Sequence, residues 1–136
     1  MLGCAAALLG GAVPVADLDV DVGALRSTKG QLRFCLTADA TSFPDCSKGA
    51  RALARSVAAG QGRVRFDALP RGQWAVAVIH DANGNGKLDT FAGIPREGFG
   101  FSNNPPIRFG APSFAESRFR VEGAASAQQV KMRYLL

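Results

Sequence analysis

The chain has 136 residues, of which 47% are hydrophobic and 20% are charged, and its formal net charge is +5. This balance is that of one globular domain long enough to bury a core. The basic residues alternate with apolar ones instead of clustering, which argues against nucleic acid as a partner. Sixteen glycines and seven prolines indicate many turns, as an all-β domain needs.

Residues 1–16 carry no charge and consist mainly of Leu, Ala, Gly and Val. They resemble the apolar and cleavage regions of a secretory signal, without its positive first region. The stretch is too short and too rich in glycine for a membrane span. We therefore expect a signal-peptide remnant followed by one domain at 17–136, in a periplasmic or extracellular protein. A lipoprotein signal at Leu2-Gly3-Cys4 and a disordered apolar tail are the alternatives.

Strict alternation of apolar and polar residues recurs along the remaining chain and predicts strands with one buried face. It occurs at 17–22, 31–36, 63–67, 118–122 and 129–134, whereas 74–79 is apolar throughout and reads as a central strand. Turn signals such as Lys29-Gly30 separate these segments. Their number and spacing predict an antiparallel β-sandwich of about seven strands.

Two segments interrupt this rhythm. Residues 48–59 are rich in alanine and fit a short helix or an extended edge strand nearly equally well. Residues 81–113 form a long stretch rich in Gly, Pro and Asn that carries four phenylalanines. Because a solvated linker does not carry so many large apolar groups, we expect this long loop to pack onto the sandwich.

Cys35 and Cys46 would remain as a pair once Cys4 leaves with the signal. Their separation suits a disulfide in an oxidising compartment, which would stabilise the fold by roughly 2–3 kcal/mol on the chain-entropy model. A zinc site is disfavoured because His80 is the sole histidine available to join them.

The segment after residue 79 carries oxygen-bearing side chains at alternate positions. We expect it to supply calcium with ligands from the side chains of Asp81, Asn83, Asn85 and Asp89 and the carbonyl of Lys87, around the sharp turn at Gly86. The position of the bidentate glutamate of an EF-hand is Ala92, so binding would be weak, with a Kd on the order of 10⁻⁴–10⁻³ M. The alternative is a structural turn in which Asn-Gly pairs supply positive φ and Asp81 caps backbone N–H groups.

Longer stretches resemble known proteins. Residues 66–78 resemble a hairpin of prealbumin-like sandwiches, and 80–89, 93–104 and 109–114 are similar to the DUF2141 family. The resemblance runs essentially from Gly23 to Tyr134. It implies a small bacterial protein, usually with a signal sequence, that has a prealbumin- or immunoglobulin-like fold and no established activity. Hydroxyisourate hydrolase resembles this chain at the level of the fold alone, because its several histidines and Tyr-Arg-Gly-Ser C-terminus are missing here.

Other residues invite functional interpretations. His80, at the end of the central strand, fits a hydrogen-bonded structural role better than catalysis, and Trp74 fits the core better than sugar stacking. A candidate partner surface consists of Glu97, Phe99, Phe101, Asn103 and Asn104. If the two Phe rings are buried, these rings instead anchor the long loop.

The leading hypothesis is therefore a non-catalytic exported module that binds a protein, peptide or glycan and is stabilised by calcium. A hydrolase that uses His80 with Asp81 and Glu97 is the second hypothesis, and it requires these side chains to converge in one cleft. A carbohydrate-binding module is the third, and it requires two or more exposed aromatic rings on one face.

Overall fold

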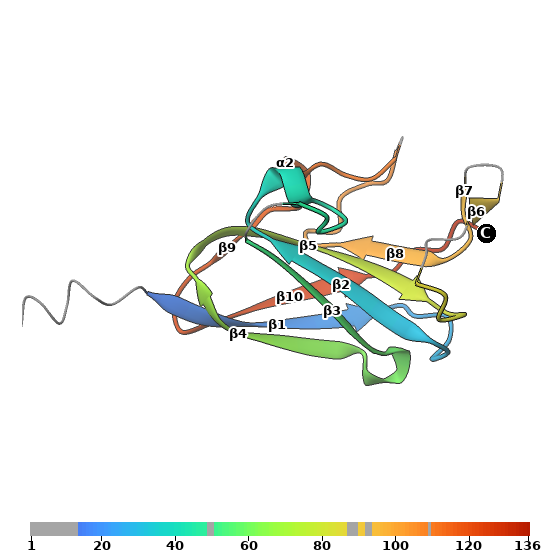
Figure 1. The fold of residues 1–136 in the computed structure, drawn as a ribbon, viewed down its shortest axis with the longest axis horizontal. Coiled ribbons are helices and arrows are strands. Elements are labelled where there is room, and N and C mark those ends of the chain that lie inside the picture. The colour runs from blue at the N-terminus through green and yellow to red at the C-terminus, as the bar shows by residue number, and fades with distance from the viewer. Residues whose placement is uncertain (1–13, 49–50, 87–89, 92–93, 109) are drawn as a thin grey trace, which may run out of the picture.

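The predicted all-β sandwich is confirmed by a computed structural model, in which two sheets face each other (Figure 1). The structure describes residues 14–136 except 49–50, 87–89, 92–93 and 109. None of the helices in these described ranges is long and apolar enough to cross a membrane.

The first sheet has three strands in the order β10-β1-β4. These are β1 (Val15–Gly23), β4 (Arg63–Pro70) and β10 (Ala125–Lys131). β1 pairs antiparallel with β4, as the predicted antiparallel sandwich requires, whereas it pairs parallel with β10. The last strand also lies earlier in the chain than the predicted 129–134. β1 begins inside the expected signal remnant, and Ala16 is buried in the core.

The second sheet has five strands, and its main path runs β3-β2-β5-β8. Its members are β2 (Gln31–Thr37), β3 (Ala52–Ala58), β5 (Gly72–Asp81), β8 (Gly98–Phe101) and β9 (Phe119–Val121), which pairs with the start of β5. All of these pairings are antiparallel. β3 settles the open alternative for 48–59, because it is an edge strand and not a helix.

Short elements complete the described chain. They are η1 (Ala40–Ser42), η2 (Ala59–Gln61), β6 (Thr90–Phe91), β7 (Ile94–Pro95) and α2 (Phe114–Ser117). α2 begins at a capping box in which Ser113 and Glu116 satisfy each other's backbone N–H groups.

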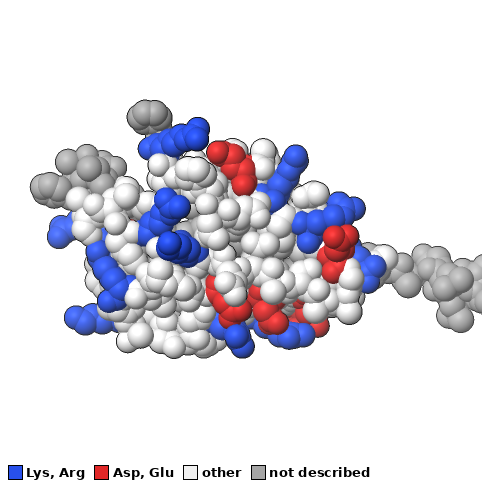
Figure 2. Space-filling view, turned by 180° about the vertical axis from the view of Figure 1, so that it is seen from behind, with Lys and Arg blue, Asp and Glu red and all other residues white. Residues whose placement is uncertain are grey.

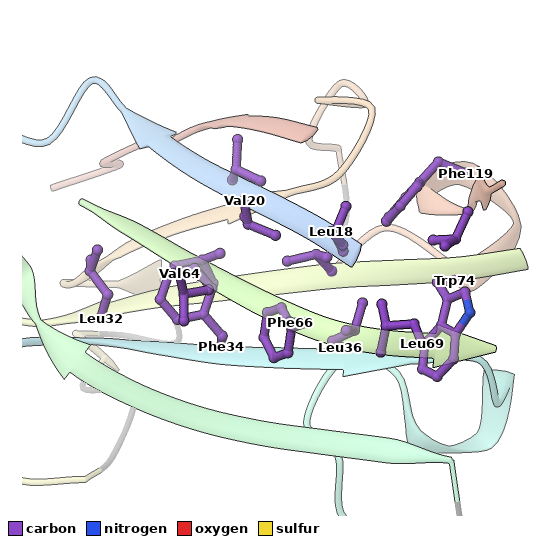
Figure 3. Packing of buried hydrophobic residues seen from close by; sticks show 14 of the residues in the cluster. Leu18, Val20, Leu32, Phe34, Leu36, Val64, Phe66, Leu69, Trp74 and Phe119 are labelled. Atoms are coloured by element: carbon purple, nitrogen blue, oxygen red, sulfur yellow. The ribbon is translucent and has the colours of Figure 1, made fainter. Parts of the chain in front are cut away.

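The alternating apolar residues of both sheets meet between the layers (Figure 3). Leu18, Val20, Phe34 and Phe66 are at most 2% exposed there. Trp74 lies in the same core, 2% exposed, and donates its indole N–H to the carbonyl of Pro70 at 2.9 Å. The core interpretation of Trp74 is therefore confirmed.

A second apolar cluster covers the outer face of the five-stranded sheet. It contains Phe99 and Phe101 of β8 together with Cys35 and Ala77, and Phe43 packs against it. The prediction that the long loop packs onto the sandwich is therefore confirmed for these two rings, whereas Phe109 lies outside the described residues. The loop is more regular than its sequence predicts, because β8 within it pairs with β5.

Candidate functional site

Asp81 ends β5 and organises the turn that follows it. Its side chain is 1% exposed. One carboxylate oxygen accepts the Asn85 N–H at 3.2 Å and the other accepts the Gly86 N–H at 2.8 Å. Gly84 and Gly86 have φ values of +68° and +76°. These contacts are the ones that the structural-turn alternative requires, because Asp81 caps N–H groups while glycine supplies positive φ.

Arg33 of β2 adds a cation to the same turn. Its Nε lies 3.8 Å from an Asp81 carboxylate oxygen, and another guanidinium N–H donates to the Gly86 carbonyl at 2.8 Å. The backbone of Gly30 approaches from the other side, where a Cβ atom would stand 2.6 Å from the carbonyl oxygen of Ala82. A metal ion near Asp81 would therefore share its carboxylate with a positive guanidinium, which weakens the attraction for a cation.

The expected calcium ligands lie partly inside and partly outside the described chain. Asn83 and Asn85 are exposed, and the side chain of Asn83 accepts the Asn85 N–H at 3.2 Å. Lys87 and Asp89 lie outside the described residues. In the part of the chain that the structure describes, no group of three or more His, Cys, Asp or Glu side chains is placed to hold a metal ion. Calcium binding stays a prediction.

His80 precedes Asp81 in β5, so its side chain lies on the opposite face of the sheet. Its side chain is 1% exposed, with Nε2 lying 2.8 Å from the Lys29 carbonyl and Nδ1 lying 2.7 Å from the Tyr134 hydroxyl. Because a carbonyl only accepts, Nε2 carries a proton, and in the neutral ring Tyr134 donates to Nδ1. Both ring nitrogens are thus used inside the fold, which is the structural role expected of this histidine.

Tyr134 is itself held by the N-terminal half of the chain. The guanidinium of Arg26 stacks 4.3 Å above its ring centroid, and the Arg26 N–H donates to its hydroxyl at 3.3 Å. No local sequence signal connects Tyr134 with His80, because the two residues are 54 positions apart. This contact is the part of the site that sequence reasoning missed.

Glu97 lies beside the turn and not in an open cleft. Its side chain is 6% exposed, and a carboxylate oxygen accepts the Ala82 N–H at 3.2 Å. The Phe99 and Phe101 rings that follow are 8% and 7% exposed. Three of the five residues of the expected partner surface are therefore buried. Only its two asparagines are exposed to a partner, and binding at this surface stays a prediction.

Asn103 and Asn104 join the end of β8 to the opposite sheet. Asn103 donates to the Arg118 carbonyl at 2.6 Å. The side chain of Asn104 donates to the Gln129 carbonyl at 3.0 Å and accepts the Lys131 N–H at 2.8 Å. Both residues have positive φ, which asparagine tolerates better than most residues do. Both asparagine side chains therefore satisfy backbone groups of neighbouring segments.

A groove of about 580 Å³ lies beside Asn104, where the end of β1 meets β10. Its lining mixes apolar, polar and oppositely charged residues, and consists of Asp21, Val22, Gly23, Ala24, Asn104, Gln129, Val130 and Lys131. In Figure 2, basic side chains are scattered over the rear face, with acidic ones among them along its lower margin.

Salt bridges on β1 and β4 account for part of this mixture. Arg65 contacts Asp17, Asp19 and Asp67. The Ala68 N–H, followed by the Arg65 guanidinium, lowers the pKa of Asp17. The acidic residues of β1 are therefore neutralised by the arginines of β4.

The predicted disulfide between Cys35 and Cys46 is present, with a Cα–Cα distance of 5.6 Å. It ties the segment after η1 to β2, next to the outer apolar cluster.

Comparison with known proteins identifies one relationship. Residues 20–129 match the model of a family described as an uncharacterized protein conserved in bacteria (DUF2141). No curated protein and no solved structure gives a significant match. Because the match covers most of the chain, the protein belongs to the DUF2141 family.

Proposed function

We propose that this protein is a non-catalytic, exported module that binds a macromolecular partner, and that calcium stabilises its 81–89 loop. The observation that carries the proposal is that the side chains proposed for catalysis form hydrogen bonds within the fold. His80 has both ring nitrogens bonded, and Asp81 and Glu97 accept backbone N–H groups. Side chains committed in this way support a scaffold better than they support proton transfer.

Export is supported by the Cys35–Cys46 disulfide, because such bonds persist in oxidising compartments. Mass spectrometry of the protein from bacterial cell fractions tests it. We expect the disulfide-bonded form in the periplasmic or extracellular fraction. Recovery of the reduced protein from the cytoplasm alone would contradict export.

Calcium binding is supported by the oxygen-bearing side chains at alternate positions, Asp81, Asn83 and Asn85, on a tight turn that the positive φ of Gly84 and Gly86 allows. Arg33 opposes it through its positive charge. The metal-stripped protein should therefore respond to millimolar calcium and hardly to magnesium, which demands stricter octahedral geometry. At ten times the Kd, binding adds about 1.4 kcal/mol to the free energy of unfolding, a rise of several degrees in Tm.

Two variants sharpen the calcium test. Asp81→Asn removes a charged ligand and should abolish the calcium-dependent rise in Tm. Arg33→Gln removes the competing cation and should increase the response at a given calcium concentration. If calcium leaves the Tm of all three proteins unchanged, the loop is a structural turn and the calcium part of the proposal is wrong.

The two alternative functions receive less support. The hydrolase hypothesis needs an accessible His80, but this side chain is 1% exposed. The carbohydrate hypothesis needs exposed rings, whereas Trp74, Phe99 and Phe101 are each at most 8% exposed. Assays with chromogenic ester substrates and with glycan arrays test both alternatives, and we expect neither turnover nor binding.

A further inference from the structure

The strand edges of the sandwich differ in how they are protected from other strands. β10 exposes the backbone of its odd-numbered residues, and Asn104 caps that edge at Gln129 and Lys131. The free edge of β4 is capped in the same way. Gln61 donates to the Arg63 carbonyl, and Arg55 donates to the Arg65 carbonyl. Such caps prevent a further strand from pairing.

The edge of β8 is closed by the chain itself. Phe99 and Arg133 exchange two backbone hydrogen bonds, at 3.0 and 2.8 Å. Gly98 and Gly100 permit this approach, because a Cβ atom on Gly100 would stand 2.5 Å from a methyl carbon of Val130.

β3 is the exception. Ala38 donates to the Arg51 carbonyl, and Ala59 donates to the Gly30 carbonyl, so the odd-numbered residues of β3 bond to β2. In an antiparallel ladder the intervening residues then point their N–H and C=O groups away from the partner strand. For β3 these are Ala52, Ala54, Ser56 and Ala58.

Ala58 is the N-cap of η2, so its carbonyl accepts the first backbone bond of that turn. No described side chain bonds to the other N–H and C=O groups of this row, and the register with β2 contains no bulge. The side chains are small, so an incoming backbone would meet no obstruction. These seven residues contain no proline, and Arg55 is the one charged residue among them that points inward.

The surroundings of β3 select the charge of a partner. Residues 46–62 contain Lys48, Arg51 and Arg55 and no acidic residue, and the acidic residues that lie near them are Asp39, beside Arg51, and Asp45, beside Lys48. None of the three forms a salt bridge with another described residue. The Arg51 and Arg55 guanidinium groups lie over the rings of Trp74 and Phe66, at 5.5 and 4.4 Å from the ring centroids. They flank Leu53, which is 41% exposed.

We propose that β3 binds an acidic, extended segment of a partner protein as an added antiparallel strand. Backbone groups of the even-numbered residues supply the hydrogen bonds, while Arg51, Leu53 and Arg55 select acidic and apolar side chains at alternate positions. A second copy of this chain fits less well, because it would bring its own Arg51 and Arg55 to the same edge as those of the first copy. The inference rests on the proposed binding function and names its surface.

The probe is a fluorescently labelled peptide of sequence TVTETVTE, which places Glu opposite Arg51 and Arg55 and Val opposite Leu53. We expect it to bind in fluorescence-anisotropy titrations at least about tenfold more tightly than the matched peptide TVTKTVTK. Equal affinity for both peptides, or no binding of either, would overturn the proposal.

A proline substitution tests the backbone contact. Ala54→Pro removes an N–H that bonds to nothing within the described chain, so the fold should persist while peptide affinity falls about tenfold or more. The control Ala54→Ser keeps this N–H and should bind as the wild type does. If Ala54→Pro binds equally well, the peptide does not pair with β3.

Amide hydrogen exchange of the unmodified protein provides a second measurement that needs no variant. The amides of residues 52, 54, 56 and 58 should exchange quickly in the free monomer and slowly with the peptide bound, whereas the odd-numbered amides should be slow in both. Slow exchange of the even-numbered amides in the free monomer would mean that the edge is already covered. If the wild-type protein is a dimer and Ala54→Pro dissociates it, a second copy of this chain occupies the β3 edge. Either result overturns the proposal.

The calcium and turnover assays keep the two proposals separable. A calcium response without peptide binding refutes strand addition and leaves the proposed function standing. Turnover of a substrate would refute the proposed function whatever the peptide does.

Discussion

His80 and Asp81 are neighbours at the end of β5, and each is 1% exposed, yet different kinds of contact hold them. Asp81 is held mainly by its own turn, since the N–H groups that it accepts lie four and five residues ahead. His80 is held by Tyr134 and Lys29, which are 54 and 51 residues away. One buried polar group is thus satisfied locally and the other through the tertiary fold.

This difference decides what each residue does for stability. The Asp81 carboxylate caps the N–H groups of one turn. When it is lost, water can bond to these N–H groups in part, because the turn lies at the surface. A buried group bonded to distant elements leaves unsatisfied partners in the interior when it is removed, which costs more. The two residues therefore offer a direct test of local against long-range polar contacts.

His80→Ala should have the largest effect. It leaves a cavity and orphans the Tyr134 hydroxyl and the Lys29 carbonyl, so we expect a loss of about 3 kcal/mol in the free energy of unfolding. In thermal unfolding this corresponds to a drop of roughly 10 °C.

The matched control is Tyr134→Phe, which removes the hydroxyl that bonds to His80 and accepts the Arg26 N–H, and leaves the ring and the Arg26 guanidinium stacked on it in place. We expect a loss of about 1 kcal/mol. If His80→Ala costs no more than Tyr134→Phe, the network around His80 does not contribute as the geometry indicates.

Asp81→Asn should have an intermediate effect. The amide retains one acceptor but turns an N–H donor toward either Asn85 or Gly86, and Arg33 loses its ionic partner. We expect a loss of about 1–2 kcal/mol in calcium-free buffer. Faster exchange of the Asn85 and Gly86 amides than in the wild type should accompany it. A loss larger than that of His80→Ala would reverse the order of local and long-range contacts proposed here.

Sequence periodicity predicted what depends on neighbouring residues. The alternation at 31–36 and 63–67 corresponds to β2 and β4, and the Trp74 strand is central because it is apolar on both faces. The turn chemistry of Asp81 was also readable, since the glycines of its two Asn-Gly pairs adopt the positive φ that glycine tolerates.

Contacts between distant segments carried no such signal. The parallel pairing of β1 with β10 depends on which edges meet, and alternation along either strand is the same for both directions. β8 escaped prediction because Gly98 and Gly100 stand where an alternating strand would carry side chains, leaving room for Tyr134 and Val130. The bonds of His80 were hidden for the same reason, because they become visible only once the C-terminal segment lies across β8.

Substitution of Asp17 should have the smallest effect on stability. Asp17 is an exposed counterpart of the buried Asp81. It also caps a backbone N–H, that of Ala68, and pairs with an arginine, Arg65, but its side chain is 36% exposed. The Ala68 N–H, followed by Arg65, lowers the pKa of Asp17 in the folded state. A carboxylate with a lowered folded-state pKa stabilises the fold above its unfolded-state pKa, and this contribution disappears as the pH falls through the folded-state value.

We therefore expect the Tm difference between the wild type and Asp17→Asn to be present near pH 7, to shrink as the pH falls below the ordinary carboxyl pKa of about 4, and to vanish once the pH lies below the lowered folded-state pKa of Asp17. Solvent screens this exposed site, so the difference at neutral pH should be smaller than that produced by Asp81→Asn. Thermal unfolding of both variants across this range, at low and at high salt, separates the two carboxylates. Added salt should shrink the Asp17 effect and spare most of the Asp81 effect, because burial shields the second carboxylate from mobile ions. If salt reduces both effects equally, burial does not distinguish the two carboxylates, and the proposed difference between the buried Asp81 cap and the exposed Asp17 cap is wrong.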